Sequence, residues 1–125
     1  MTEPGRLFDA GIFEQSLAQN APAMQLHLLE TCTSTNVECQ RLMTHGALVV
    51  SEHQSAGRGR RGRSWYSPSG RNLYCSIGVE KNLPAASLGL IPLLVGCTLA
   101  EALHNDAGIR VGVKWPNDLL LGGDK

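Results

Sequence analysis

The chain has 125 residues, 42% of them hydrophobic and 18% charged, a composition typical of a globular domain and not of a disordered or fibrous chain. Its basic and acidic residues are equal in number, so it has no net charge that would attract nucleic acid or a membrane surface. Its four cysteines are not paired as C-x-x-C, and no histidine stands at metal-ligand spacing from them, so we predict no zinc site and no disulfide framework.

No targeting segment is visible at the start of the sequence. Residues 1–6 are polar, and no apolar stretch of the kind found in secretory signal peptides follows them. Residues 82–100 carry no charge, but prolines, glycines and polar residues interrupt this stretch. We therefore expect a buried helix there, no membrane association, and a protein of the reducing cytoplasm.

The first elements that the sequence predicts are a helix and a strand. Apolar residues at helical spacing predict a helix over residues 7–17, and residues 20–22 break it. From Met24 to Leu28, apolar side chains alternate with Gln and His, which is typical of a strand.

A second helix, a short strand and a long loop are expected next. Thr35 followed by Glu38 matches a capping box, so a helix is predicted to begin at about Thr35, and Gly46 is predicted to end it. Residues 47–51 form a short apolar run typical of a buried strand. Residues 52–71 are rich in Gly, Arg and Ser, which favours a loop.

The second half of the chain predicts more strands around one long helix. Strict alternation over residues 73–79 predicts a half-buried strand. Pro84 is predicted to open the helix, with a kink at Pro92 and an end near residues 106–108. The remaining elements are two strands and a hairpin turn, over residues 110–114, 119–121 and 122–124.

These elements mix without a strict βαβ order, which predicts an α+β fold with a mixed β-sheet flanked by helices. We expect residues 1–23 to be an N-terminal helix and linker, and residues 24–125 to be the first part of one domain. A hairpin with only one arm would leave backbone groups unpaired, so we expect the domain to continue beyond Lys125.

The most informative stretch, Gly57 to Arg63, reads GRGRRGR. No acidic residue lies between His53 and Val79, whereas five arginines do, so a local anion site is expected inside a neutral protein. Glycines let backbone amides approach an anion, and guanidinium groups match phosphate and carboxylate oxygens. Such a loop could close over a phosphorylated ligand, with Trp65 covering a ring. An arginine-rich RNA-binding arm or a solvated loop would have the same composition.

Two shorter motifs could also contact a ligand. Residues 114–118 read KWPND and place Lys114 at a strand end, where it can reach into a cleft as a point charge or simply lie in solvent. Residues 34–36 read STN at a helix start, where they could meet a polar ligand or only cap the helix. Gln54 could pair with an amide-like group or solvate the loop.

Together and in this order, the motifs resemble those of the biotin protein ligases, over about residues 30–121. The residues that carry the resemblance are Ser34, Thr35 and Asn36, then Gln54 and Gly57 to Arg63, then Trp65, Ser67, Pro68, Asn72, Leu73 and Tyr74, and finally Lys114 to Asp118. The resemblance implies a catalytic domain of the biotin/lipoate protein ligase type, which is similar to that of class II aminoacyl-tRNA synthetases. It also implies formation of biotinyl-5′-AMP from biotin and ATP with Mg²⁺, followed by transfer of biotin to one lysine of a biotin carboxyl carrier protein.

The resemblance also implies roles for individual residues. The expected biotin-binding residues are Ser34, Thr35, Asn36, Gln54, Gly57, Arg58, Gly59 and Lys114. The expected nucleotide- and adenylate-binding residues are Arg58, Arg60, Arg61, Arg63, Trp65 and Asn117. Lys114 and Arg60 are the expected catalytic residues, with the Lys114 ammonium between the biotin carboxylate and the α-phosphate. No metal ligand is predicted in the protein.

The resemblance leads to further expectations about partners and extent. The segment before residue 30 is short for the DNA-binding winged helix of some members, so we expect no DNA binding. The C-terminal part of the catalytic domain and a small β domain are expected beyond Lys125, and the first part alone is not expected to complete the reaction. A homodimer formed through the sheet is expected. Two alternatives are a lipoate or octanoyl protein ligase or transferase of the same fold, and a small RNA-binding module that uses the arginine-rich loop.

Overall fold

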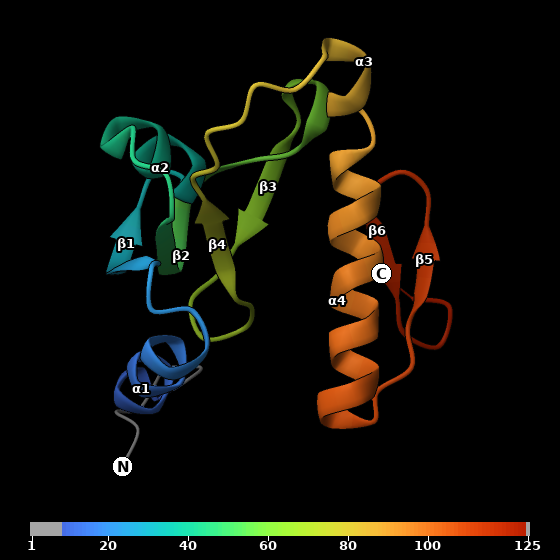
Figure 1. The fold of residues 1–125 in the computed structure, drawn as a ribbon, viewed down its shortest axis with the longest axis horizontal. Helices are drawn as coiled ribbons and strands as arrows, with labels where there is room; N and C mark the ends of the chain where they lie inside the picture. The colour runs from blue at the N-terminus through green and yellow to red at the C-terminus, as the bar shows by residue number, and fades with distance from the viewer. Residues whose placement is uncertain (1–8, 125) are drawn as a thin grey trace. The chain divides into compact units, whose positions relative to one another are not determined.

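The structure is a computed structural model that describes residues 9–124. The chain forms two compact units, Met1–Glu80 and Lys81–Lys125, each with its own secondary structure (Figure 1). The first unit contains a four-stranded sheet and two helices, and the second contains two helices and a two-stranded hairpin.

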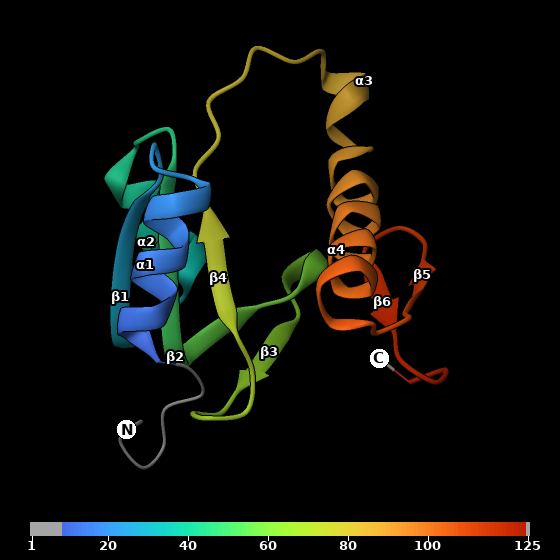
Figure 2. The same ribbon diagram turned by 60° about the horizontal axis from the view of Figure 1, so that its bottom comes forward.

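The sheet of the first unit is mixed and is built around one long strand. Its strands are β1 (Gln25–Cys32), β2 (Ala47–Arg58), β3 (Ser64–Ser67) and β4 (Tyr74–Ile77). β1 runs parallel to β2, whereas β3 and β4 both run antiparallel to it (Figures 1 and 2). β4 pairs with the first half of β2 and β3 with its second half, so three strands converge where the two halves meet.

The first half of β2 forms the centre of the core. Ala47, Val49 and Val50 are at most 1% exposed, and the six residues from Ala47 to Glu52 are all buried, on both faces of the strand. Helix α2 (Thr35–Leu42) contacts β2 and β4. The apolar run at the start of β2 therefore forms the buried strand that its sequence predicts.

Helix α1 (Ala10–Asn20) agrees with the described part of the predicted first helix. Asp9 caps it, because its Oδ1 accepts a hydrogen bond of 3.1 Å from the backbone N–H of Ile12. The predicted start at residues 7 and 8 lies outside the described residues.

The second unit consists of α3 (Ala85–Leu88), α4 (Ile91–Ala107) and the antiparallel strands β5 (Gly112–Lys114) and β6 (Asp118–Leu120). The hairpin packs against α4 at Gly96, where an added Cβ would lie 3.7 Å from Val113 and 3.9 Å from Leu119. As predicted, a tight turn follows β6, with Leu121 and Asp124 exchanging two backbone hydrogen bonds across two glycines of positive φ.

The mixed α+β architecture is confirmed, but the predicted loop over residues 52–71 is wrong. Glu52–Arg58 continues β2, and Ser64–Ser67 forms β3, so only a short connection separates the two strands. The pairing is the reason: β1 extends along β2 as far as Gln54, and Arg58 pairs with Ser64. A composition rich in Gly and Arg does not reveal such non-local pairs.

The predicted start of α2 at about Thr35 is confirmed, whereas the predicted capping box and the predicted end at Gly46 are wrong. Ser34 is the N-cap in place of Thr35, whose hydroxyl bonds to other strands, and Glu38 pairs with Arg41 at 3.4 Å. The helix ends at Leu42, before Gly46, with Met43 in the left-handed conformation.

Two expectations for the long helix need correction. Pro92 stands in the first turn of α4 and does not kink it. Backbone N–H groups in the first turn have no acceptor within the helix, so a proline there removes no hydrogen bond of the helix. Within the described residues Gly96 is the one buried residue of α4, so the helix is not buried as expected; the hairpin covers one short part of it. By length and composition alone, the segment Ala85–Ala107 could cross a membrane.

Candidate functional site

A polar cavity of about 230 Å³ lies in the first unit, where the start of α2 meets β2, β3 and β4. Six of the residues predicted to contact a ligand line it, and they come from three separate segments. These six are Ser34, Thr35, Asn36, Gln54, Arg58 and Trp65. The other lining residues are Leu73, Tyr74, Cys75 and Ser76.

Gln54 is fixed at the centre of the cavity by the start of α2. Its Oε1 accepts one hydrogen bond of 2.9 Å from the backbone N–H of Thr35 and another of 3.2 Å from the Thr35 hydroxyl. An N–H group can only donate, so the side-chain oxygen of Gln54 must face Thr35 and its nitrogen must face away.

The nitrogen side of Gln54 is held by β3. Nε2 donates to Ser67 Oγ at 3.0 Å, and the Ser67 hydroxyl donates to the backbone oxygen of Trp65 at 3.2 Å. Ser67 is 3% exposed, so this bond lies out of solvent. The Gln54 amide is therefore held at both ends, by groups from two different elements.

Gly57 leaves room for this arrangement. A Cβ at this position would lie 2.6 Å from both Ser67 Oγ and the Trp65 backbone oxygen, and 3.1 Å from Gln54 Nε2. Gly57 pairs with Trp65 just after an irregularity in the β2–β3 ladder. A residue with a side chain would not fit at this position, because β3 and the Gln54 amide occupy the space that its Cβ would need.

Ser76 joins β4 to the start of α2. Its Oγ lies 2.9 Å from the Thr35 hydroxyl and donates to Asn36 Oδ1 at 2.5 Å. Nearby, the Tyr74 hydroxyl accepts from Asn72 and donates to the backbone oxygen of Pro68. No sequence motif singles out Ser76. The alternation of residues 73–79 is the one signal in the sequence for its position, because it places the Ser76 side chain on the face opposite Cys75.

The open part of the cavity wall carries groups that can meet a ligand. Ser34 is 2% exposed, yet its hydroxyl does not cap α2 although Ser34 occupies the N-cap position. Arg58 and Trp65 lie at the β2–β3 side, where the Trp65 side chain is half exposed. The cavity thus offers an array of hydroxyl, amide and guanidinium groups beside an aromatic ring, suited to a small polar ring system.

The rest of the Gly-Arg stretch forms the tip of the β2–β3 hairpin. Arg60–Gly62 makes one 3-10 turn, closed by a bond of 2.7 Å from the Gly59 N–H to the Arg63 backbone oxygen. Arg60, Arg61 and Arg63 are exposed, and Arg61 has a positive φ of 58°. These residues and the two glycines Gly57 and Gly59 adjoin the cavity along the chain but are not among its lining residues.

Lys114 and Asn117 belong to the second unit. Lys114 ends β5 opposite Asp118 and is exposed, and Asn117 lies in the connection between β5 and β6. Because Val113 faces α4 at Gly96, strand alternation puts the Lys114 side chain on the other face of the hairpin, together with Gly112 as predicted.

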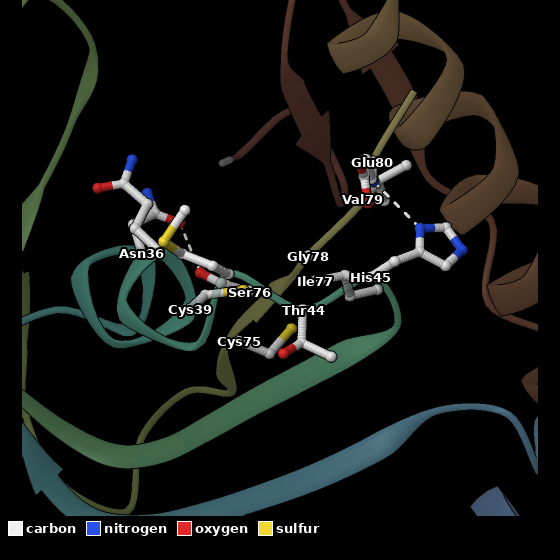
Figure 3. Close-up of a pocket in the computed structure, with 12 residues that line it drawn as sticks. Asn36, Cys39, Thr44, His45, Cys75, Ser76, Ile77, Gly78, Val79 and Glu80 are labelled. Atoms are coloured by element: carbon white, nitrogen blue, oxygen red, sulfur yellow. Dashed lines mark hydrogen bonds between the residues drawn. The ribbon is translucent and has the colours of Figure 1, made fainter. Parts of the chain in front are cut away.

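A second cavity, of about 600 Å³, lies beside the first, between α2, the segment that follows it and the end of β4 (Figure 3). The two cavities share Asn36, Cys75 and Ser76. In the larger one, His45 Nδ1 accepts from the Glu80 N–H at 3.1 Å, and burial raises the pKa of the Cys75 thiol, which keeps it protonated. Of the predicted site residues it contains Asn36 alone, so we place the candidate site in the smaller cavity.

The fold and this array define a domain of known type. Residues 29–125 match the family described as "Biotin/lipoate A/B protein ligase family", and the chain belongs to this family. It is 39% identical over 97% of its length to the bifunctional ligase/repressor BirA of Salmonella typhimurium. It is 28% identical over 95% of its length to the biotin–[acetyl-CoA-carboxylase] ligase of Mycobacterium tuberculosis.

Solved structures agree with this assignment. The biotin protein ligase of Leishmania major in complex with biotinyl-5-AMP matches 79% of this chain with a TM-score of 0.65 and 34% identity. That of Aquifex aeolicus in complex with biotin and ATP matches 78% with a TM-score of 0.62 and 33% identity. The predicted biotin/lipoate protein ligase-type fold is therefore confirmed.

The chain spans only part of each of these relatives. It covers 38% of the Salmonella protein, 48% of the mycobacterial protein, and 48% and 41% of the two solved chains.

Proposed function

We propose that the protein to which this chain belongs is a biotin protein ligase. It joins biotin to ATP to give biotinyl-5′-AMP and pyrophosphate, and then transfers biotin to a lysine of a biotin carboxyl carrier protein. A relative named biotin–[acetyl-CoA-carboxylase] ligase supports the proposal, as do two solved biotin protein ligases, one in complex with biotinyl-5-AMP and the other with biotin and ATP.

The observation that carries the proposal is the polar cavity. Two motifs that are 19 residues apart, at Thr35 and Gln54, meet there through two hydrogen bonds, and Arg58 and Trp65 complete the wall. We assign Ser34, Thr35, Asn36 and Gln54 to the ureido ring of biotin, which is a compact set of N–H donors and one carbonyl acceptor.

The basic residues have an electrostatic role in this proposal. Attack of the biotin carboxylate on the α-phosphate of ATP brings two anions together, forms the new P–O bond and expels pyrophosphate. Arg58, Arg60 and Lys114 supply the positive charge that lowers this barrier. Arg61 and Arg63 at the hairpin tip, with Trp65 and Asn117, are assigned to the adenylate, and the hairpin would cover it against water.

Mg²⁺ is expected with the phosphates of ATP. Within residues 9–124, His, Cys, Asp and Glu side chains form no group of three that could hold a metal ion. Mg²⁺ that accompanies ATP is held mainly by the phosphates and water, with one or two carboxylates, and we assign the ion no step.

The decisive experiment measures pyrophosphate release by the full-length protein with biotin or lipoate as the acid. We expect release with biotin and little with lipoate. Equal release with both acids would favour a lipoate or octanoyl protein ligase or transferase instead. If neither acid supports release and RNA binds in a salt-dependent way at physiological ionic strength, an RNA-binding module is the better assignment.

The proposal extends to partners and location. The acceptor is the lysine of a biotin carrier domain, and a homodimer formed through the sheet is expected because β1 leaves one edge of the described sheet open. We propose a cytoplasmic enzyme that binds neither DNA nor membrane. Size-exclusion chromatography of the full-length protein with and without biotin and ATP tests the dimer.

A further inference from the structure

Ser76 occupies a position that neither the sequence motifs nor the proposed function uses. It lies on β4, in the wall shared by the two cavities, and bonds to two successive residues of α2. Figure 3 shows its bond to Asn36 from the side of the larger cavity. Thr35 is one of these residues and holds Gln54, while Asn36 is the other and lines both cavities.

The single hydroxyl proton of Ser76 decides the direction of these bonds. Asn36 Oδ1 can only accept, so Ser76 gives its proton to Asn36 over the 2.5 Å contact. Ser76 must then be the acceptor in its 2.9 Å contact with Thr35, whose single hydroxyl proton is shared between Ser76 Oγ and, at 3.2 Å, Gln54 Oε1. The Asn36 oxygen is thereby occupied, and the groups that Asn36 keeps for a ligand are the two N–H donors of Nδ2.

The hydrogen-bonding groups that Gln54 can offer a ligand are limited in the same way. Its oxygen faces Thr35, where it accepts from the backbone N–H and shares the hydroxyl proton with Ser76. One hydrogen of Nε2 goes to Ser67, so the second N–H hydrogen is what remains for a ligand. The guanidinium of Arg58, also in the wall, has donors alone. Three of the polar side chains of the cavity thus present donors and no acceptor.

We propose that Ser76 is a positioning residue that holds the Asn36 amide with its N–H donors toward the cavity, beside the donors of Gln54 and Arg58, and so selects a ligand with a carbonyl-type acceptor oxygen. The inference rests on the proposed function, in which that acceptor is the ureido oxygen of biotin. Without the Ser76 hydroxyl, the Asn36 amide is free to turn its oxygen into the cavity, and the selectivity is lost. Loss of one such hydrogen bond changes binding by roughly tenfold.

The test compares two substitutions of nearly equal shape, Ser76→Thr and Ser76→Val, in the full-length protein. Thr retains the hydroxyl, whereas Val replaces it by a methyl group. Competition titrations measure the affinity for biotin and for its guanidino analogue, 2-iminobiotin, which is protonated at neutral pH and offers donors in place of the carbonyl oxygen.

We expect Ser76→Thr to keep the wild-type preference for biotin over the analogue. Ser76→Val should weaken biotin binding roughly tenfold and reduce that preference by a similar factor. Ser76→Ala, which is smaller and cannot overpack the site, should reduce the preference in the same direction. Thermal unfolding of every variant shows whether it is folded.

Two results would overturn the inference. One is an unchanged preference in Ser76→Val and Ser76→Ala, even if both ligands bind more weakly, because a structural defect lowers both affinities alike. The other is a Thr variant that loses the preference as fully as the Val variant. If wild-type protein does not bind biotin at all, the proposed function itself is wrong, which is a different outcome from either of these.

Discussion

The backbone N–H of Thr35 donates to the side-chain oxygen of Gln54 over 2.9 Å, and this bond ties the start of α2 to the middle of β2. The same N–H lies in the first turn of a helix, where no backbone acceptor is available to it. Gln54 therefore satisfies a helix terminus and, at its other end, presents an N–H toward the ligand cavity. Structure and recognition depend on one amide group.

Gln54→Leu should lower both the stability of the protein and its affinity for biotin. The substitution leaves the Thr35 N–H without its acceptor, which costs about 2 kcal/mol of unfolding free energy, and it removes a donor from the cavity, which weakens biotin roughly tenfold. Urea unfolding and biotin titration measure the two effects. Gln15→Leu, at an exposed position of α1, is the matched control and should change neither. Normal biotin affinity in Gln54→Leu would remove Gln54 from the site.

Gly57→Ala should also be destabilising, although it adds one methyl group. The new Cβ would be placed 2.6 Å from the Trp65 backbone oxygen, so β3 must shift, at a cost of about 2 kcal/mol. Gly89→Ala is the control, because nothing lies within 4 Å of an added Cβ there and its φ is −66°. Urea denaturation should show a loss for Gly57→Ala and none for Gly89→Ala; equal stabilities would mean that the close approach is relieved at no cost.

The sequence predicted some parts of this arrangement because local patterns determine them. The apolar run at residues 47–51 gave the buried start of β2, since side-chain burial there follows from the local sequence. The alternation at 73–79 gave the strand β4 but the wrong buried face, because Leu73 and Ile77 are more than half exposed and Tyr74 is buried. Thr35 and Gln54, which the motifs assign to one ligand, line one cavity. Local sequence patterns suffice to predict a helix or strand whose position depends only on residues of that same segment.

Other parts depended on pairing between distant segments. The extension of β2 through Gly57 depends on β1 and β3, and the identity of the α2 N-cap depends on Thr35 being drawn to Gln54 and Ser76. No spacing rule within the helix reveals that Ser34, one residue earlier, takes the cap. Ser76 itself was missed because a single serine in an alternating strand has no sequence signature.

Met43→Gly should stabilise the protein. Met43 follows α2 with a φ of 47°, a left-handed conformation that costs most side chains about 1 kcal/mol and costs glycine little. Its side chain is 90% exposed, so little packing is lost with it. Thermal unfolding should show a higher Tm for Met43→Gly than for Met43→Ala, which keeps a Cβ in the same conformation. A Tm no higher than that of Met43→Ala would mean that this conformation is not a source of strain.

Lys114→Ala should lower the rate of adenylate formation more than biotin affinity. In the proposed function the ammonium acts where carboxylate and phosphate approach one another, so its loss affects the transition state most, by roughly 10²–10³ in rate. Single-turnover adenylation and biotin titration, run on the full-length protein, separate the two quantities. Lys81→Ala, an exposed lysine at the start of the second unit, is the control. A wild-type adenylation rate in Lys114→Ala would exclude Lys114 from the mechanism.

Arg60→Gly should let the intermediate escape. Arg60 begins the 3-10 turn at the tip of the β2–β3 hairpin, in a stretch that has five arginines and no acidic residue between His53 and Val79. Phosphate and carboxylate groups of biotinyl-5′-AMP would relieve the repulsion among these arginines, so we expect the hairpin tip to open and close without ligand and to become protected with it. Without the Arg60 guanidinium, the ligand stabilises the closed form less, and biotinyl-5′-AMP should appear in solution faster than with wild-type protein.

The assays are the release of free biotinyl-5′-AMP over time and proteolysis of the hairpin tip with and without ligand. Arg110→Gly is the control for loss of an exposed arginine. If the tip is protected equally in both states and Arg60→Gly retains the intermediate as wild type does, the hairpin is a static scaffold and does not gate the site.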